Sequence, residues 1–278
     1  MTALRAGVAH GLSANPGKQA AERFVLGYTP VWAALVGAAM ISGAARKWGD
    51  GLLLILGVGL WAPLAIRPLI WPSLEERRTT WHRRYAVKIQ AWMLVFAFLG
   101  NWFGTRYFYE VLDMHYGFNS TLNPNHVPLF LYFLTVTYFS TYSVVANIGR
   151  RFLVRWVPPW FAWALIAVTL AALETASNAN PFMAGAFCYG RLGFALWFGT
   201  LLYGTWFLIA APLWFPIDES PGIDTPWRTV LGSVLAAFML ILVAMELFEQ
   251  AIAPLVTTVH LGTVGLRDFG QSCLGQKP

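Results

Sequence analysis

The sequence is poor in charged residues and has almost no cysteine. Asp, Glu, Lys and Arg make up 12% of its 278 residues, whereas soluble domains carry roughly a quarter. The two cysteines, Cys188 and Cys273, have no partner at a metal-binding or redox spacing. A signal-peptide pattern is missing too, because residues 1–23 are polar and mixed. We therefore expect neither a disulfide framework nor a zinc site.

Several motifs of catalysis and cofactor binding are also missing. The five histidines form no HxxxH or HxxHH box, which argues against a di-iron membrane hydroxylase or desaturase. The chain contains no glycine-rich phosphate loop, no GxGxxG and no Gly-x-Ser-x-Gly sequence. No metal and no other cofactor is expected. Acid–base chemistry on a lipid without a cofactor, or transport, remains.

What the sequence does contain is long apolar runs. Hydrophobic residues make up 57% of the chain and aromatic residues 16%. Seven runs are close to the roughly 20 residues that a helix needs to cross a bilayer. We predict an all-α integral membrane protein with one transmembrane domain and a polar tail at 252–278. The predicted spans are 24–42, 52–71, 86–103, 127–147, 160–177, 192–214 and 229–251.

Lys and Arg are unevenly distributed between the two ends of these spans. The end with the N-terminus holds roughly twice as many as the other end, and cationic loops tend to stay in the cytoplasm. We therefore predict a cytoplasmic N-terminus. These loops also account for a pI of about 9.5, so the expected partner is the lipid bilayer and not nucleic acid.

Two carboxyl groups lie inside predicted spans, where ionisable groups are costly and usually face an interior or a cavity. Glu174 lies near the end of the fifth span and Glu246 in the last third of the seventh. Because both spans run outward, we expect the two carboxyls at similar depth in the outer half of the bundle. A carboxyl in a low-dielectric pocket can stay a neutral acid, which a general acid requires. Packing is the competing interpretation, in which Glu174 pairs with Arg106 or an amide.

Short matching stretches spread over nearly the whole chain carry a resemblance. They include Asn15-Pro16, Lys18, Glu22, Tyr28-Thr29-Pro30, Arg84-Tyr85, Lys88, Gly100-Asn101, Asn147, Leu173-Glu174-Thr175, Asp218-Glu219 and Cys273-Leu274. In their order and coverage they resemble the cycloeucalenol cycloisomerase family, the cyclopropyl-sterol isomerases of plant sterol synthesis. The chain would be a bacterial relative.

The resemblance implies a sterol isomerase that opens the 9β,19-cyclopropane ring of a cyclopropyl sterol to give a Δ8 sterol. Glu174 would donate the proton, and Glu246 would act as the base or adjust the acidity of Glu174. The side chains expected to bind or orient the sterol are Asn101, Tyr107, Asn125, His126, Tyr142, Asn180, Trp92 and Arg106. His126 and Arg106 differ from the family's pattern, which makes cycloartenol an alternative substrate to cycloeucalenol.

Two other functions fit the same residues. A non-enzymatic sterol or lipid carrier would use the pocket without needing an acid. A proton-coupled transporter would relay protons through the two glutamates, but its typical inverted repeats and broken helices are not clear in this sequence. In each case we expect a multi-pass membrane protein, in the inner membrane of a bacterium, whereas the plant family is found in the endoplasmic reticulum.

Overall fold

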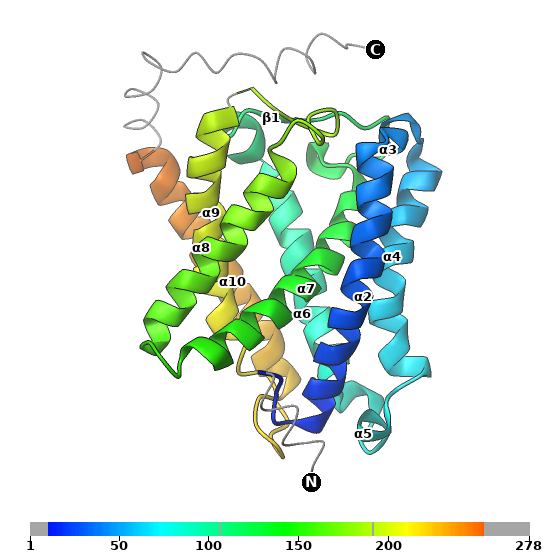
Figure 1. Ribbon diagram of the computed structural model, residues 1–278, viewed down its shortest axis with the longest axis vertical. Coiled ribbons are helices and arrows are strands. Elements are labelled where there is room, and N and C mark those ends of the chain that lie inside the picture. The colour runs from blue at the N-terminus through cyan, green and yellow to red at the C-terminus, as the bar shows by residue number, and fades with distance from the viewer. Residues whose placement is uncertain (1–10, 106, 191, 253–278) are drawn as a thin grey trace.

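The computed structural model describes residues 11–105, 107–190 and 192–252, which form a bundle of long helices (Figure 1). Among these residues, seven helices are long and apolar enough to cross a membrane, so the predicted fold class is confirmed. They are α2 (Pro16–Ile41), α4 (Asp50–Ile70), α6 (Tyr85–Phe103), α7 (Leu129–Leu153), α8 (Pro159–Asn178), α9 (Leu192–Trp214) and α10 (Trp227–Leu247).

Two of the long helices extend more than five residues beyond their predicted bounds, and short elements connect the long helices. The first span begins at Pro16 because the side chain of Asn15 accepts hydrogen bonds from the first turn and proline suits that position. The fourth span continues to Leu153. The short elements are α3 (Ala44–Lys47), α5 (Leu74–Arg77), the 3-10 helices Trp81–Arg83 and Pro124–His126, and the π-helices Tyr107–Val111 and Phe248–Ile252.

Helix α7 is the centre of the bundle. It packs on α2, α4, α6, α8 and α9, and α2 and α8 lie on opposite sides of it (Figure 1). Several of its buried hydroxyl groups bond back to their own helix: Thr135 donates to the Leu131 carbonyl at 2.6 Å and Ser140 to the Val136 carbonyl at 2.7 Å. These bonds satisfy hydroxyls that would otherwise be costly to bury.

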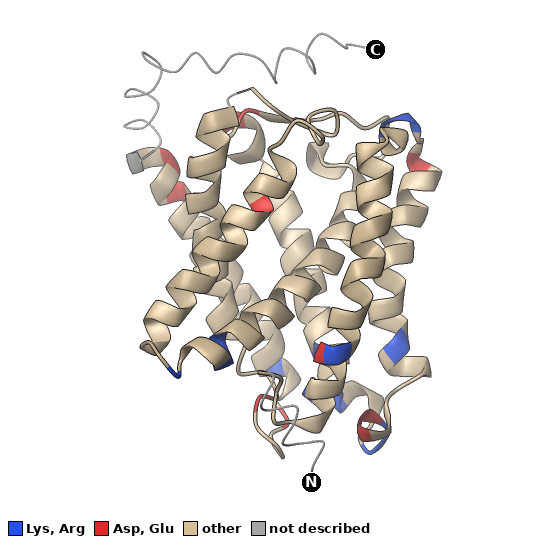
Figure 2. Ribbon diagram, in the orientation of Figure 1, with Lys and Arg blue, Asp and Glu red and all other residues tan. Residues whose placement is uncertain are grey.

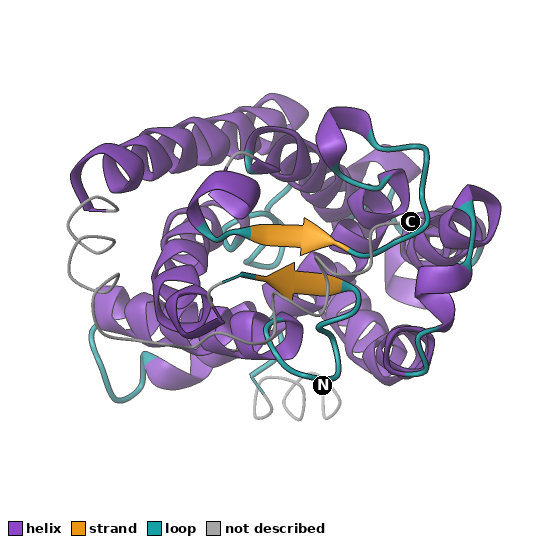
Figure 3. Cartoon of the chain, turned by 90° about the horizontal axis from the view of Figure 1, so that it is seen from above, coloured by secondary structure: helices purple, strands orange, loops and turns teal. Residues whose placement is uncertain are grey.

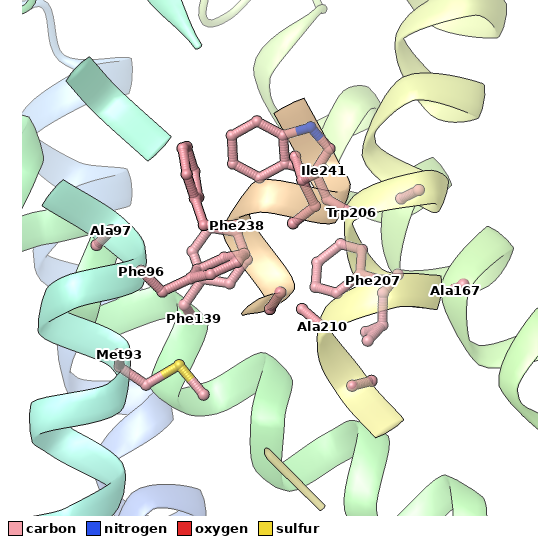
Figure 4. Packing of buried hydrophobic residues seen from close by; sticks show 14 of the residues in the cluster. Met93, Phe96, Ala97, Phe139, Ala167, Trp206, Phe207, Ala210, Phe238 and Ile241 are labelled. Carbon is pink, nitrogen blue, oxygen red and sulfur yellow. The ribbon is translucent and has the colours of Figure 1, made fainter. Parts of the chain in front are cut away.

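Aromatic rings from four helices form the core on one side of α7 (Figure 4). Phe96 of α6 meets Phe139 of α7 and Trp206 of α9 edge to face, with ring centroids 5.1 and 5.8 Å apart. Phe238 of α10 also lies edge to face with Trp206, at 6.1 Å. Gly100 permits this packing, because a Cβ there would lie 2.9 Å from the Trp206 ring. Such aromatic pairs add specific geometry to the burial of large apolar surfaces.

A two-stranded antiparallel sheet crosses one end of the bundle, and the sequence did not predict it (Figure 3). Its strands are β1 (Met114–Tyr116) and β2 (Phe187–Tyr189), with Tyr116 opposite Phe187. Side chains alternate across a strand, so Met114 and Tyr116 turn to the interior while His115 is partly exposed. The sheet thereby ties the chain after α6 to the chain after α8.

Some predictions concern residues outside the described part of the chain. These are the roles of Arg106 and Cys273 and most of the polar tail at 252–278. Cys188 is described, and it corrects an expectation: its spacing indicated no disulfide, but it is disulfide-bonded.

The end of the bundle at which α2 begins carries a buried ionic network, and many Lys and Arg residues gather at that end (Figure 2). The network comprises Lys18, Glu22, Lys88, Arg151, Asp218, Glu219 and Asp224. Lys18 and Lys88 count among the cations that predicted the cytoplasmic end, yet their side chains are 0% and 1% exposed. These two lysines are therefore buried ion-pair partners and not solvated loop charges.

The network joins segments that are far apart in the sequence. Arg151 of α7 contacts Glu22 of α2 at 2.8 Å and Glu219, which follows α9, at 2.7 Å. Lys18 contacts the same Glu219 at 2.8 Å, and Lys88 of α6 contacts Asp218 at 2.8 Å. Each buried charge thus has a partner of opposite sign, without which its burial would be prohibitive.

Candidate functional site

A cavity of about 670 Å³ lies in the half of the bundle that ends at the sheet. Residues of α2, α6, α7, α8, α9 and both strands line it. Its volume falls within the roughly 300–1,000 Å³ that is typical of ligand pockets. Most of the lining is aliphatic or aromatic, including Trp32, Phe96, Phe139 and Trp206. The space therefore suits a largely apolar molecule.

Glu174 places a carboxyl group in the wall of this cavity. The residue is 5% exposed and lies four residues before the end of α8, or about 6 Å along the helix axis. Tyr142 of α7 donates its hydroxyl to Oε2, and Asn178 donates its side-chain amide to Oε1 at 3.0 Å. Both bonds are donated to the carboxyl, so both stabilise its ionised form.

Glu174 stands out because the rest of the lining carries so little charge. Among the described residues, it is the only acidic side chain that lines the cavity, and no Lys, Arg or His lines it. No cluster of His, Cys, Asp or Glu in the described ranges could hold a metal ion. What the site offers chemically is one carboxyl, held by a phenol and an amide, in an apolar wall.

A second group of polar side chains lies on the α6–α7 side of the cavity. Asn101 uses both N–H groups of its amide, donating to the Ala97 carbonyl at 2.8 Å and to Thr135 Oγ1 at 3.0 Å. Tyr138 also donates to Thr135, at 3.2 Å. The amide oxygen of Asn101 is then the natural acceptor for a ligand hydroxyl.

Several aromatic residues line the cavity together with this carboxyl. The rings of Tyr138 and Tyr142 lie 5.5 Å apart on successive turns of α7, and Phe207 of α9 lies 5.6 Å from Tyr142. Tyr189 of β2 and Tyr203 of α9 line the same space. Electron-rich ring faces attract a cation held within about 6 Å, so this wall can stabilise positive charge that develops on an apolar ligand.

The structure brings four of the predicted site residues together at the cavity: Glu174, Asn101, Tyr142 and Asn180. Asn180 lies just beyond α8, where its side-chain oxygen accepts the N–H of Phe182 at 3.0 Å and of Met183 at 3.2 Å. Its role is thus partly to shape the turn that leads toward β2.

Other predicted residues lie elsewhere, and their expected place at the site is corrected. Glu246 is exposed on α10, bonds to Gln250 one turn later and is not part of the cavity lining. Trp92 is fully buried in the core, where its indole N–H donates to Ser233 at 3.0 Å. Tyr107 is buried in its π-helix and also does not line the cavity. Glu246 lies on the exposed face of its helix, whereas Trp92 lies toward the opposite end of the bundle, against Trp214 at the end of α9.

Asn125 and His126 lie outside the cavity as well. Both are exposed in left-handed backbone conformations, with φ of 50° and 66°. They line a separate surface depression with Trp102 and Tyr109. Asn125 donates to the Trp102 carbonyl and Tyr109 to the His126 carbonyl, so these residues hold a loop at the end of α6.

Sequence reasoning missed several residues that line the cavity. Asn178 is the most important, and its position four residues after Glu174 could have revealed it, since such residues share a helix face. Tyr138 precedes Tyr142 by one turn in the same way. Tyr116 and Tyr189 had no such signal, because they reach the site through the unpredicted sheet.

Fold and cavity together define a polytopic membrane protein with a lipid-sized apolar site around one buried carboxyl. No family model and no solved structure matches the chain. It is 30% identical over 279 residues, covering 95% of this chain and 93% of the relative, to a protein of Arabidopsis thaliana named cycloeucalenol cycloisomerase. The chain belongs to the cycloeucalenol cycloisomerase family, as the resemblance indicated.

Proposed function

We propose that this protein is a sterol isomerase that opens the 9β,19-cyclopropane ring of a cyclopropyl sterol to form a Δ8 sterol. Its family membership supports the reaction class. The observation that carries the mechanism is Glu174, a buried carboxyl in an apolar cavity of suitable size. Cycloeucalenol and cycloartenol are the substrates to compare.

The reaction adds one proton to the sterol and removes another, so no protons are consumed overall. Glu174 in its neutral form transfers its proton to C19, and the C9–C19 bond breaks. The bonding electrons form the new C19–H bond, which leaves a cation at C9. Loss of the proton on C8 then places the double bond between C8 and C9. No oxidant, reductant or cofactor is consumed.

Glu174 alone can serve both proton transfers. C19 and the hydrogen on C8 project from the same face of a 9β,19-cyclopropyl sterol, so a carboxylate left above that face lies close to both. Tyr142 and Asn178 donate hydrogen bonds to this carboxylate, and such preorganised donors lower the energy of charge that forms during reaction. Glu246, which does not line the cavity, has no part in this scheme.

The cavity wall protects the cation between the two transfers. Tyr138, Tyr203 and Trp206 line the same cavity as Glu174, and the faces of aromatic rings stabilise positive charge. Their apolar bulk keeps water from trapping the cation as an alcohol.

Asn101 is the group we propose to bind the sterol 3-hydroxyl. Its amide oxygen accepts a hydrogen bond from the hydroxyl, while its N–H groups stay bonded to Ala97 and Thr135. A single hydrogen bond of this kind fixes the sterol in one register along the cavity, with the cyclopropane at Glu174.

The test is turnover by purified protein in liposomes. Cycloartenol or cycloeucalenol is supplied in the membrane, and the high-field proton signals of the cyclopropane are followed by NMR. We expect these signals to disappear, and product made in deuterated water should carry deuterium at C19. Deuterium absent from C19 would refute protonation at that carbon.

Two matched variants separate catalysis from binding. Glu174→Gln keeps the shape of the side chain but removes the proton, so turnover should stop while the sterol still binds. Glu246→Gln changes an exposed carboxyl on α10. This variant should convert the sterol at the same rate as the unmodified protein. If the unmodified protein binds sterol but the cyclopropane signals persist, the protein is a carrier and not an isomerase.

A further inference from the structure

The cavity is open to its surroundings at one side only, as judged from the residues that line it. Lining residues on α6, α7 and α9 are buried or partly buried. The exposed ones lie on α2, on α8 or in the loop after α8. They are Ala33, Ile41, Ser177 and Phe182. Ile41 is 63% exposed and Phe182 is 74% exposed.

The end of the cavity near the sheet is covered. Beyond the β1–β2 pairing, Gly117 donates its N–H to the Ala186 carbonyl at 3.0 Å. Gly185 packs directly on the side chain of Arg46 in α3, since a Cβ there would lie 2.5 Å from a guanidinium nitrogen. The segment between α8 and β2 therefore forms a roof that reaches across to α3.

The opening between α2 and α8 reaches well into the membrane. Helix α2 lines the cavity from Trp32 to Ile41, a length of about 14 Å along the axis. Half the hydrocarbon thickness of a bilayer is about 15 Å. The α2 side of the opening is apolar, with Ala33, Val36 and Gly37 on it. An apolar opening of this length suits acyl chains better than water.

We propose that sterol enters and leaves the cavity sideways from the bilayer, through this portal between α2 and α8. The portal is defined by Ala33, Gly37, Ile41, Ser177 and Phe182. A sterol is dissolved in the membrane, and this path spares it a passage through water, which would expose its whole apolar surface. The inference rests on the proposed function for the class of ligand.

Gly37 offers the sharpest test, because a Cβ at this position meets no atom within 4 Å. Gly37→Phe therefore adds a ring to the portal without forcing the backbone to move. Gly27 is the matched control: it lies on the same helix, has the same open surroundings and does not line the cavity. Gly27→Phe reproduces the change in helix propensity and surface, but not the obstruction.

The measurement is the initial rate at which protein takes up radiolabelled cycloartenol from phosphatidylcholine vesicles. Each portal or control substitution is combined with Glu174→Gln, so that uptake is measured without turnover. Gly37→Phe should slow uptake about tenfold, since each passage has to displace the added ring. Gly27→Phe should leave the rate unchanged. Ala33→Phe, on the same side of the portal, replaces Gly37→Phe if that variant does not fold.

The outcomes distinguish the two proposals. Equal uptake by the Gly37→Phe and Gly27→Phe variants, with turnover intact in the unmodified protein, overturns the portal and leaves the isomerase. Slowed uptake by Gly37→Phe, together with no conversion of the sterol by protein that retains Glu174, supports the portal and overturns the isomerase. Failure of every variant and of the unmodified protein to take up cycloartenol overturns both.

Discussion

Replacing Lys88 by methionine should destabilise the protein far more than replacing an exposed cation. Lys88 Nζ lies 3.0 and 2.8 Å from the two carboxylate oxygens of Asp218, and both side chains are nearly inaccessible, at 1% and 4% exposed. Methionine keeps the length of the side chain but leaves the Asp218 carboxylate buried without a cation. Arg78 is the control, because it is 76% exposed and pairs with Glu75, which is itself 41% exposed.

The expected magnitude follows from burial. Removing one partner of a buried ion pair costs about 3–5 kcal/mol, whereas an exposed pair contributes about 0–1 kcal/mol. At roughly 2 °C per kcal/mol for a chain of this size, Lys88→Met should lower the melting temperature by about 6–10 °C. Arg78→Met should shift it by about 2 °C or less.

The assay is thermal unfolding in detergent, followed by intrinsic tryptophan fluorescence. Asp218→Asn and the double variant with Lys88→Met complete a double-mutant cycle. The double variant should lose less than the sum of the two single losses, because neither charge is then left alone. Additive losses, or equal shifts for Lys88→Met and Arg78→Met, would refute the view that this pair is energetically coupled.

Three further predictions concern the carboxyl, the hydroxyl site and pH. Tyr142→Phe removes a hydrogen bond to the Glu174 carboxylate, worth about 1.5–3 kcal/mol, so steady-state kinetics should show kcat lowered roughly 10- to 100-fold. Asn101→Leu should raise KM about tenfold with little change in kcat, because it acts on binding away from the reacting bond; an unchanged KM would exclude it from sterol binding. Burial opposes ionisation of Glu219, but hydrogen bonds from Arg151 and the charge of a nearby lysine outweigh it and hold the pKa of Glu219 below its ordinary value of 4.5. A lowered pKa contributes stability above the ordinary value and loses it as the pH falls through the lowered one, so melting temperatures should decline below about pH 4.5, and a flat profile there would contradict the ion pairing.

The seven helices could be predicted because a bilayer imposes a length and a composition on any helix that crosses it. The sheet could not, since each strand is only three residues long and pairs with a partner about 70 residues away in the chain. The ionic network was misread for a related reason. Lys18 and Lys88 lie where loop cations are expected, and only the packed bundle shows that Glu219 and Asp218 cover them.

Glu174 and Glu246 show how far a single sequence can go within the site. Both are isolated carboxyls in apolar runs, and the same reasoning selected both. Glu174 falls on the inner face of α8, whereas Glu246 falls beside the buried Met245 but on the exposed side of α10. In helices that are apolar all round, hydropathy barely distinguishes the buried face from the lipid-facing one.

The ionic network also sets an order for assembly during synthesis. Lys18 donates to the carbonyl of Ile217, which is 199 residues later in the chain, so at about 5–20 residues per second the ribosome makes the acceptor roughly 10–40 s after the donor. Glu22 gains Arg151 earlier, after 129 residues. An ammonium group without a partner in hydrocarbon is costly. We therefore expect Lys18 to stay at the membrane surface until Ile217 has been made. Among the described helices α2 is made first, yet its contacts are complete only after α9 has been made.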